Sequence, residues 1–176
     1  SIIGTQWNPT LEAVCQKILK PAKFTATFNR ENQAIPPILN NLITQLEERS
    51  QISEAELLTQ PSIFVLMTEL DRVDDLRRSY EEYYSPESPL AQQIKRLFSE
   101  GPSKGIHLIL SFSGIKALSN VFDIRRNLAY FRHRVALQMS EDDSFTFVNN
   151  RQASRLQADG DIPIKAVYVD TDSDRN

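Results

Sequence analysis

The sequence is poor in the residues on which several common kinds of site depend. Its 176 residues include one cysteine, two histidines and five glycines. The single cysteine, Cys15, allows no internal disulfide and no cysteine-rich zinc site, and this favours a reducing compartment. No apolar run approaches the roughly 18 residues that a membrane span needs. We therefore expect a cytoplasmic chain, with any membrane anchor in the parent protein.

The charge balance also excludes a strong global attraction to polyanions. The chain has 20 basic and 23 acidic residues, a net charge of -3, so contact with nucleic acid needs a local basic patch. With 40% hydrophobic residues the chain can bury one substantial core, and we expect a single domain over residues 1–176. The chain opens with Ser1 without a signal-peptide pattern, and we expect a piece of a longer protein.

Short apolar runs alternate along the chain with segments of helical period. Strands are predicted at 23–28, 62–67, 106–112, 133–139 and 164–170, and helices at 10–19, 35–50, 89–101 and 140–150. The central runs are apolar throughout, as in parallel strands that are buried on both faces. This alternation predicts an α/β fold with a mostly parallel sheet flanked by helices. Segments 81–89 and 170–176 are predicted to be loose.

The stretch "SIFVLMTELDRV" (62–73) runs from an apolar strand directly into charge. In nucleoside triphosphatases, a strand ending in two acidic residues offers one carboxylate to the water shell of Mg²⁺ and another to the attacking water. Here the pair is Thr68 and Glu69. The threonine hydroxyl adds no negative charge, so we predict no metal site. Glu69 either serves as a general base or is only the first solvated residue after a buried strand, and the missing phosphate loop favours the second interpretation.

A phosphate-binding loop is missing from the sequence. Such a loop has the pattern G-x-x-x-x-G-K-[ST], and its backbone N–H groups cradle the phosphates. None of the five glycines is followed by lysine. We therefore expect no independent ATP hydrolysis and no cofactor in this chain, with ATP and Mg²⁺ belonging to the full-length protein.

Three separated motifs, "EGPSKGIHLILSFS" (100–113), "IRRNLAYFRHRVALQMSEDDS" (124–144) and "ASRLQADGD" (153–161), carry a family resemblance. Their order and spacing resemble the carboxyl half of the FtsK/SpoIIIE family of DNA-translocating P-loop motors. The matching positions are Gly105 to Leu110, Ile124, Asn127, Arg134 to Ala136, Ser140, Asp143, Ser144, Leu156, Gly160 and Asp161. The resemblance covers about residues 62 to 170 and implies a RecA-like P-loop NTPase-type sheet.

The departures from the family pattern concern the chemistry of phosphate. Active members carry Asp-Glu where this chain has Thr68 and Glu69, and Thr-Gln where it has Phe112 and Ser113. By resemblance, Glu69 holds the catalytic position, and Thr68, Ser113 and Arg134 hold cofactor-binding positions.

The amino-terminal segment 2–19 falls where the family has its phosphate loop. It keeps Gly4 but has no second glycine followed by lysine. This pattern is similar to the degenerate FtsK-like domains that lie behind active ones in the membrane-anchored ATPases of type VII secretion systems.

Three hypotheses about function follow. The first is a non-hydrolysing FtsK-like module of a larger DNA- or protein-translocating motor, whose partners are other domains or subunits, with a ring oligomer in the parent. The second is the catalytic part of an ATP-dependent DNA translocase whose phosphate loop lies outside this chain. The third is a module that binds a partner in a degenerate nucleotide pocket.

Several residues keep two interpretations. The arginines Arg125, Arg126, Arg132 and Arg134 either contact DNA or a neighbouring subunit's phosphate, or belong to a surface helix with salt bridges that leads into a strand. His107 is interpreted as a packed, hydrogen-bonded residue rather than a ligand. Asp170 and Asp172 have the spacing of an aspartyl phosphotransferase nucleophile and its acid partner, but we interpret them as a solvated tail.

Overall fold

The computed structural model describes residues 2–4, 13, 17, 26–28, 35–76, 88–157 and 165–171. Its contacts group the chain into two compact units, Ser1–Ser113 and Gly114–Asn176. The prediction of one domain over residues 1–176 stays a prediction. Among the described residues, no helix is both long enough and apolar enough to cross a membrane.

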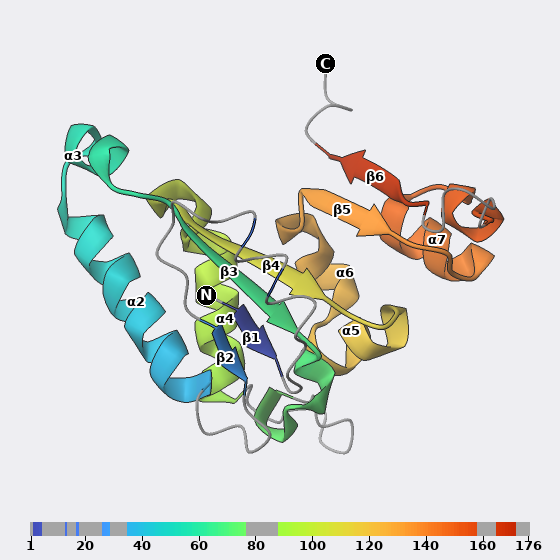
Figure 1. Cartoon of the computed structure of the whole chain (residues 1–176), viewed down its shortest axis with the longest axis horizontal. Helices are drawn as coiled ribbons and strands as arrows, with labels where there is room; N and C mark the ends of the chain where they lie inside the picture. Colours follow the sequence, from blue (N-terminus) through green and yellow to red (C-terminus); the bar gives the residue numbers. More distant parts are fainter. Residues whose placement is uncertain are drawn as a thin grey trace. The chain divides into compact units, whose positions relative to one another are not determined.

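The first unit contains a parallel sheet of four strands. These are β1 (Ile2–Gly4), β2 (Ala26–Phe28), β3 (Ile63–Thr68) and β4 (Ile106–Ser111). Their order across the sheet is β2-β1-β3-β4, and each neighbouring pair is parallel (Figure 1). The predicted α/β fold with a parallel sheet is therefore confirmed for this unit.

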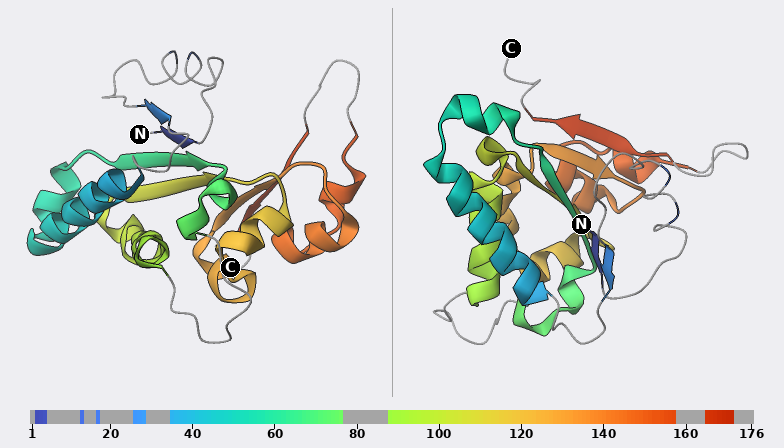
Figure 2. Two further views of the ribbon diagram at one scale, coloured as in Figure 1. Left: turned by 90° about the horizontal axis from the view of Figure 1, so that it is seen from below. Right: turned by 60° about the vertical axis from the view of Figure 1, so that its left-hand side comes forward.

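Among the described residues of the first unit, three α-helices connect these strands. They are α2 (Ile35–Gln51) and α3 (Glu54–Thr59) between β2 and β3, and α4 (Pro89–Glu100) between β3 and β4. Three 3-10 turns are η1 (Leu70–Arg72), η2 (Asp74–Leu76) and η3 (Pro102–Lys104). The helices α2 and α4 lie side by side on the same side of β3 and β4, as both views in Figure 2 show. Because both connections run across the sheet in the same direction, right-handed crossovers require this common side.

The core of the first unit lies between these two helices and one face of the sheet. Strand β3 alternates between buried and more exposed residues, and Val65 and Met67 are fully buried. The helices contribute apolar residues spaced three or four apart, which places them on one stripe. The buried ones are Ile35, Leu39, Leu42 and Leu46 of α2, and Leu90, Ile94, Leu97 and Phe98 of α4.

Local sequence signals set the helix boundaries. Ser53 caps α3 in a capping box with Glu56, each side chain accepting from the other's backbone N–H. Ser88 caps α4 by accepting from the N–H of Ala91, and Pro89 fits the first helical turn because its missing N–H is not needed there.

The two glycines of the "EGPSKG" motif have different structural reasons. Gly101 has an ordinary right-handed φ of -56°, but an added Cβ would lie 2.3 Å from the carbonyl oxygen of Leu97 and 2.8 Å from that of Ile106. Gly105 has a φ of +70°, the left-handed conformation that glycine adopts without strain, and it leads from η3 into β4. Helix α4 ends at Glu100, one residue before the end of the predicted helix at 89–101.

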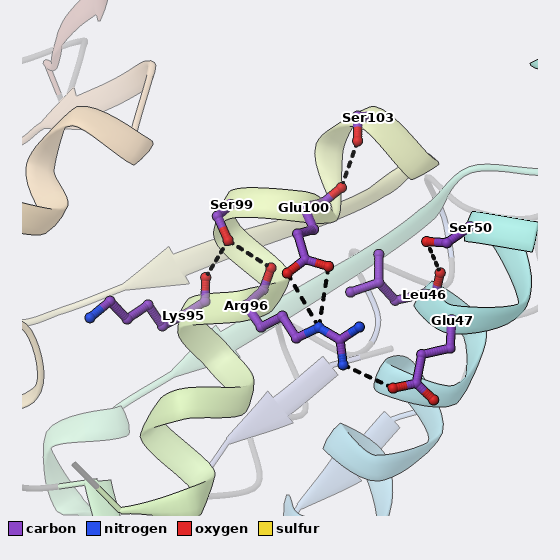
Figure 3. Close-up of polar contacts among 8 residues, drawn as sticks. All are labelled: Leu46, Glu47, Ser50, Lys95, Arg96, Ser99, Glu100 and Ser103. Carbon is purple, nitrogen blue, oxygen red and sulfur yellow. Dashed lines mark hydrogen bonds and ion pairs between the residues drawn. The ribbon is translucent and has the colours of Figure 1, made fainter. Parts of the chain in front are cut away.

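On the solvent side, polar contacts join α2 to α4. Arg96 of α4 donates to Glu47 of α2 at 2.9 Å and pairs with Glu100 at 3.2 Å (Figure 3). The hydrogen bond to Glu47, and then that to Glu100, raises the pKa of the Arg96 guanidinium. Because all three side chains are at least 39% exposed, water and salt screen the network, which adds little to stability.

The second unit combines short helices with two strands. Its elements are α5 (Ile115–Val121), α6 (Ile124–Asn127), η4 (Leu128–Tyr130), β5 (His133–Ala136), α7 (Glu141–Val148), η5 (Gln152–Arg155) and β6 (Val167–Asp170). Ser140 caps α7 by accepting from the N–H of Asp143. The buried residues Ala136, Val148, Ala153 and Val167 form a small core.

The pairing of β5 with β6 differs from the predicted sheet. Both strands were expected in a mostly parallel sheet, but they pair with each other in antiparallel fashion, with Val135 opposite Tyr168. The prediction of strands here is confirmed, but they form a separate antiparallel pair instead of joining the mostly parallel sheet. An apolar run shows that a strand is buried but carries no signal for the direction of its neighbour.

Several predictions fall on residues outside the described ranges. The predicted helix at 10–19 is described only at Ala13 and Lys17, both of which are helical and exposed. The predicted loose segments are described only at Ser88, Pro89, Asp170 and Thr171. Gly160 and Asp161 of the third family motif also lie outside the described residues.

Candidate functional site

The order of the strands marks one place on the sheet where a ligand is expected. The chain leaves β1 for β2 on one side and leaves β3 for β4 on the other, so β1 and β3 form a topological switch point. In open α/β sheets, ligands bind beyond the carboxyl ends of the strands at such a point. The register Ile2–Leu66 and Ile3–Met67 brings the last residues of these strands, Gly4 and Thr68, to the same edge.

Glu69 follows β3 at this edge and has an unusual backbone. Its φ of 57° and ψ of 35° are left-handed, a conformation that costs a non-glycine residue on the order of 1–3 kcal/mol. Its N–H donates to the carbonyl oxygen of Ser111 at 3.4 Å, and its carbonyl accepts from the N–H of Arg72. The bend therefore ends the β3 ladder and turns the chain into η1, with Glu69 at the start of the turn.

The carboxylate of Glu69 lies next to a positive charge. Its Oε1 is 3.2 Å from a guanidinium nitrogen of Arg72, and the two side chains are 33% and 53% exposed. Half-exposed pairs of this kind are screened by water. The residue predicted as a catalytic base is thus accessible from solvent and paired within its own turn.

Ser113 lies near the same edge, two residues beyond the end of β4. Thr68 is the register partner of Ser111, so the ends of β3 and β4 adjoin. Thr68 is half-buried and Ser113 is exposed. Parallel pairing of β3 with β4 therefore places Thr68 and Glu69 next to the end of β4, and Ser113 follows that end.

Arg134 belongs to the second unit, where it holds backbone carbonyls. Its Nε donates to the carbonyl of Phe131 at 2.8 Å, Nη1 to Phe147 at 2.8 Å and Nη2 to Leu128 at 3.3 Å. Burial lowers the pKa of this guanidinium from its ordinary value. These bonds join β5, η4 and the carboxyl end of α7, where a positive charge also complements the helix dipole. The geometry gives Arg134 a structural task, and its predicted cofactor role stays a prediction.

The other arginines of the basic cluster are more exposed. Arg125 and Arg126 lie on α6, and Nε of Arg126 is 3.8 Å from a carboxylate oxygen of Asp123. Asp123 also caps the helix by accepting from the N–H of Arg126. Arg132 is exposed just before β5. This arrangement fits the interpretation of a surface helix with an ion pair that leads into a strand, and it leaves the DNA contact as a prediction.

An open pocket of about 590 Å³ lies within the second unit. Polar groups from the end of α7 and from β6 line it, including Asn149, Asn150, Asp170 and Thr171, and Arg134 contributes to one wall. None of Thr68, Glu69 and Ser113 is among its lining residues.

The two histidines lie in ring contacts. The ring of His107 stacks on Phe64 with centroids 4.9 Å apart, and Nδ1 of His133 is 2.8 Å from the hydroxyl oxygen of Tyr168. The packing part of the interpretation of His107 is thus confirmed. Asp170 lies 3.8 Å from His133. Among the residues with described positions, no group of three or more His, Cys, Asp or Glu side chains is arranged to hold a metal ion.

A buried arginine, Arg49, was not anticipated from the sequence. It is 6% exposed, and its guanidinium donates to the carbonyls of Lys104 at 2.9 Å and Pro61 at 2.8 Å. These carbonyls precede β4 and β3, so Arg49 holds the starts of both strands against α2. The available signal was its position, since it continues the apolar stripe of Leu42 and Leu46.

The chain was compared with known proteins at three levels. No family model, no curated protein and no solved structure matches it. The resemblance to FtsK/SpoIIIE motors therefore rests on the motifs of the sequence alone.

Proposed function

We propose that this chain is a degenerate FtsK/SpoIIIE-like, RecA-type module that does not hydrolyse ATP and that acts through contacts with other domains or subunits of a larger translocating motor. The observation that supports this most is the composition of the edge where β1 and β3 end. It offers one carboxylate, Glu69, next to the uncharged Thr68, and no phosphate loop accompanies it in the sequence.

The chemistry of phosphoryl transfer explains why these residues do not suffice. Catalysis of this reaction depends on positioning the phosphates and neutralising their charge with backbone N–H groups, a lysine and Mg²⁺. The segment 2–19 supplies no glycine-lysine pair. At Thr68, a hydroxyl replaces the carboxylate that would hold the water shell of Mg²⁺. A base at Glu69 has no bound phosphate on which to act.

A second candidate is the catalytic part of a DNA translocase whose phosphate loop lies elsewhere. The observation that favours it is the left-handed backbone at Glu69, because strained residues concentrate at functional sites. In this case Glu69 is the base, and Arg125, Arg126 and Arg132 supply a basic surface for DNA.

Isothermal titration calorimetry with Mg²⁺-ATP tests whether the chain lacks a nucleotide site, as the first candidate requires. For the degenerate module we expect no heat of binding up to about 1 mM nucleotide, in the wild type and in Glu69→Gln. A parallel ATPase assay is expected to give the same rate for both proteins. Binding in the micromolar range, or hydrolysis that Glu69→Gln abolishes, would overturn the degenerate module and would indicate a phosphate-binding site within this chain.

A double variant of this chain tests the DNA contact that the second candidate requires. Replacing Arg125 and Arg126 together by glutamine removes two exposed charges from α6. If these residues contact phosphates, the salt dependence of DNA binding decreases with each lost contact. For the degenerate module we expect no measurable binding of duplex DNA at physiological salt by either protein.

A further inference from the structure

The pocket of the second unit is bounded by the carboxyl end of α7 and by residues of β5 and β6. Its volume of about 590 Å³ is within the range of roughly 300–1,000 Å³ that small-molecule sites occupy. Its lining residues all belong to Gly114–Asn176, so the pocket is defined within one unit. Thr68, Glu69 and Ser113 do not line it, and a ligand bound here is therefore a separate matter from a nucleotide at the edge of the sheet.

The guanidinium of Arg134 keeps hydrogen-bond donors that no described residue uses. A guanidinium has five N–H groups. Three of them donate to the carbonyls of Phe131, Phe147 and Leu128, one from each nitrogen. No further hydrogen bond of Arg134 is found within the described ranges, so one N–H of Nη1 and one N–H of Nη2 remain. Two N–H groups on neighbouring nitrogens of a guanidinium match the two oxygens of a carboxylate.

The positive charge of Arg134 is half-buried, and no ion pair with a described carboxylate compensates it. Burial lowers the pKa of the guanidinium because its charged form has lost part of its hydration. Asp170 also lines the pocket, but it is the register partner of His133, the residue before Arg134 in β5. Successive side chains of a strand point to opposite faces, and the Asp170 carboxylate lies 3.8 Å from Nδ1 of His133. It therefore lies on the face opposite the guanidinium.

The surroundings of Arg134 favour an anion with one negative charge over a phosphate. The pocket lies at the carboxyl end of α7, where the helix dipole has its negative pole. Phosphate sites commonly use the backbone N–H groups of a helix amino terminus instead. A carboxylate carries one charge, which the guanidinium balances. Phe145, which is 56% exposed, and Leu128 offer apolar surface for the rest of such a ligand.

We propose that this pocket binds a small monocarboxylate with an apolar or aromatic group, its oxygens held by Nη1 and Nη2 of Arg134 and its apolar group packed on Phe145. The exposed side chains of Thr146 and Asn149 also line the pocket and can add hydrogen bonds. The three carbonyls that hold the guanidinium reduce the ordering that binding requires. The site goes beyond the proposed function, since it needs no nucleotide and no Mg²⁺.

An NMR titration of the 176-residue chain with phenylacetate tests the proposal. Phenylacetate is expected to shift the amides of Thr146, Asn149 and Val169 to saturation, with a Kd of about 0.1–10 mM, as for other ligands of this size. Phenylacetamide has nearly the same shape without the charge, and it is expected to bind at least about tenfold more weakly. Inorganic phosphate, the third probe, is expected to bind more weakly than phenylacetate because of the helix dipole.

Two exposed positions of the second unit supply a matched pair of variants. Phe145→Ala removes a ring that lines the pocket, and it is expected to weaken phenylacetate binding at least about threefold. Leu137 is 53% exposed and is not among the lining residues, so Leu137→Ala is the control and is expected to bind like the wild type. Arg134→Lys keeps the charge but offers a single ammonium, and it is expected to weaken binding about tenfold.

Several results overturn the proposal. They are the absence of saturable shifts up to about 10 mM phenylacetate, equal affinities for phenylacetate and phenylacetamide, and equal effects of Phe145→Ala and Leu137→Ala. Phosphate that binds more tightly than phenylacetate also overturns it, because the pocket then selects a different anion. Both ligand comparisons use the wild type, so they do not depend on the folding of Arg134→Lys.

Discussion

Replacing Arg49 by methionine removes a buried charge that connects three elements of the first unit. The methionine keeps most of the side chain's apolar stem and removes the guanidinium that donates to Lys104 and Pro61. A third contact, to the carbonyl of Gly105 at 3.5 Å, is at the limit of a hydrogen bond. Two carbonyls that precede strands thus lose their donors.

The magnitude follows from these two bonds. A hydrogen bond to a charged group contributes about 1.5–3 kcal/mol net, and two of them give an upper range of about 3–6 kcal/mol. Pro61 is exposed and Lys104 is half-buried, so water can reach their carbonyls in the variant. We therefore expect a loss of about 2–3 kcal/mol in the free energy of unfolding, or roughly 4–12 °C in Tm.

Urea unfolding of matched variants measures this effect. Arg96→Met makes the same chemical change in an exposed network and is expected to cost less than about 1 kcal/mol. Arg49→Lys replaces the guanidinium by a single ammonium group, which donates to one of the two carbonyls at a time. We expect it to lose about half as much free energy of unfolding as Arg49→Met. Equal losses for Arg49→Met and Arg96→Met, at unchanged m-values, would refute the reasoning.

Three further predictions concern the backbone and one helix cap. Gly101→Ala brings a methyl group into contact with two backbone carbonyls and is expected to cost about 1–3 kcal/mol in urea unfolding, whereas Gly114→Ala meets no atom within 4 Å and is expected to be neutral; equal effects contradict the steric argument. At Glu69, asparagine tolerates the left-handed backbone and valine does not, so we expect Glu69→Val to unfold more easily than Glu69→Asn by about 1–2 kcal/mol. Hydrogen bonds from the backbone and then the side chain of Ser53 lower the pKa of the Glu56 carboxyl below its ordinary 4.5. The stabilisation of α3 by this carboxylate is therefore present above pH 4.5 and is lost as the pH falls through the lowered pKa. Ser53→Ala is expected to move the pKa back upward in an NMR titration, and an unchanged pKa argues against the capping box as its cause.

The first unit was largely predictable because its sequence signals are local and agree with one another. The predicted strands at 62–67 and 106–112 correspond to β3 and β4, and the predicted helix at 35–50 corresponds to α2. Continuous apolar runs, a stripe of helical period and capping residues each point to the same element in these segments.

The details that were missed depend on contacts between distant residues. The antiparallel pairing of β5 with β6 is decided by which strands meet, and neither apolar run carries that information. The left-handed backbone at Glu69 could not be predicted, because glycine and asparagine usually indicate this conformation and neither stands at this position. Arg134 stands at a family position that suggested phosphate, but its donors reach carbonyls that only the folded chain brings near.

The candidate edge itself was found from the sequence through the residues that follow the strands. Thr68 and Glu69 were singled out because nucleoside triphosphatases carry an acidic pair after an apolar strand, and the register of β3 with β4 places both residues where parallel strands end. Ser113 was singled out by the family resemblance, because Phe112 and Ser113 stand where active members have Thr-Gln. The chemistry at this edge stays a hypothesis that depends on the missing phosphate loop.

The central proposal is that this α/β fold has no nucleotide site where β1 and β3 end. The most direct measurement is an NMR titration of the chain with Mg²⁺-ATP, following the backbone amides of Gly4, Thr68, Glu69 and Ser111. The account predicts that these amide shifts stay unchanged up to about 1 mM nucleotide. Saturating shifts centred on Thr68 and Glu69, at micromolar nucleotide, would contradict it and would show that phosphates bind where β1 and β3 end.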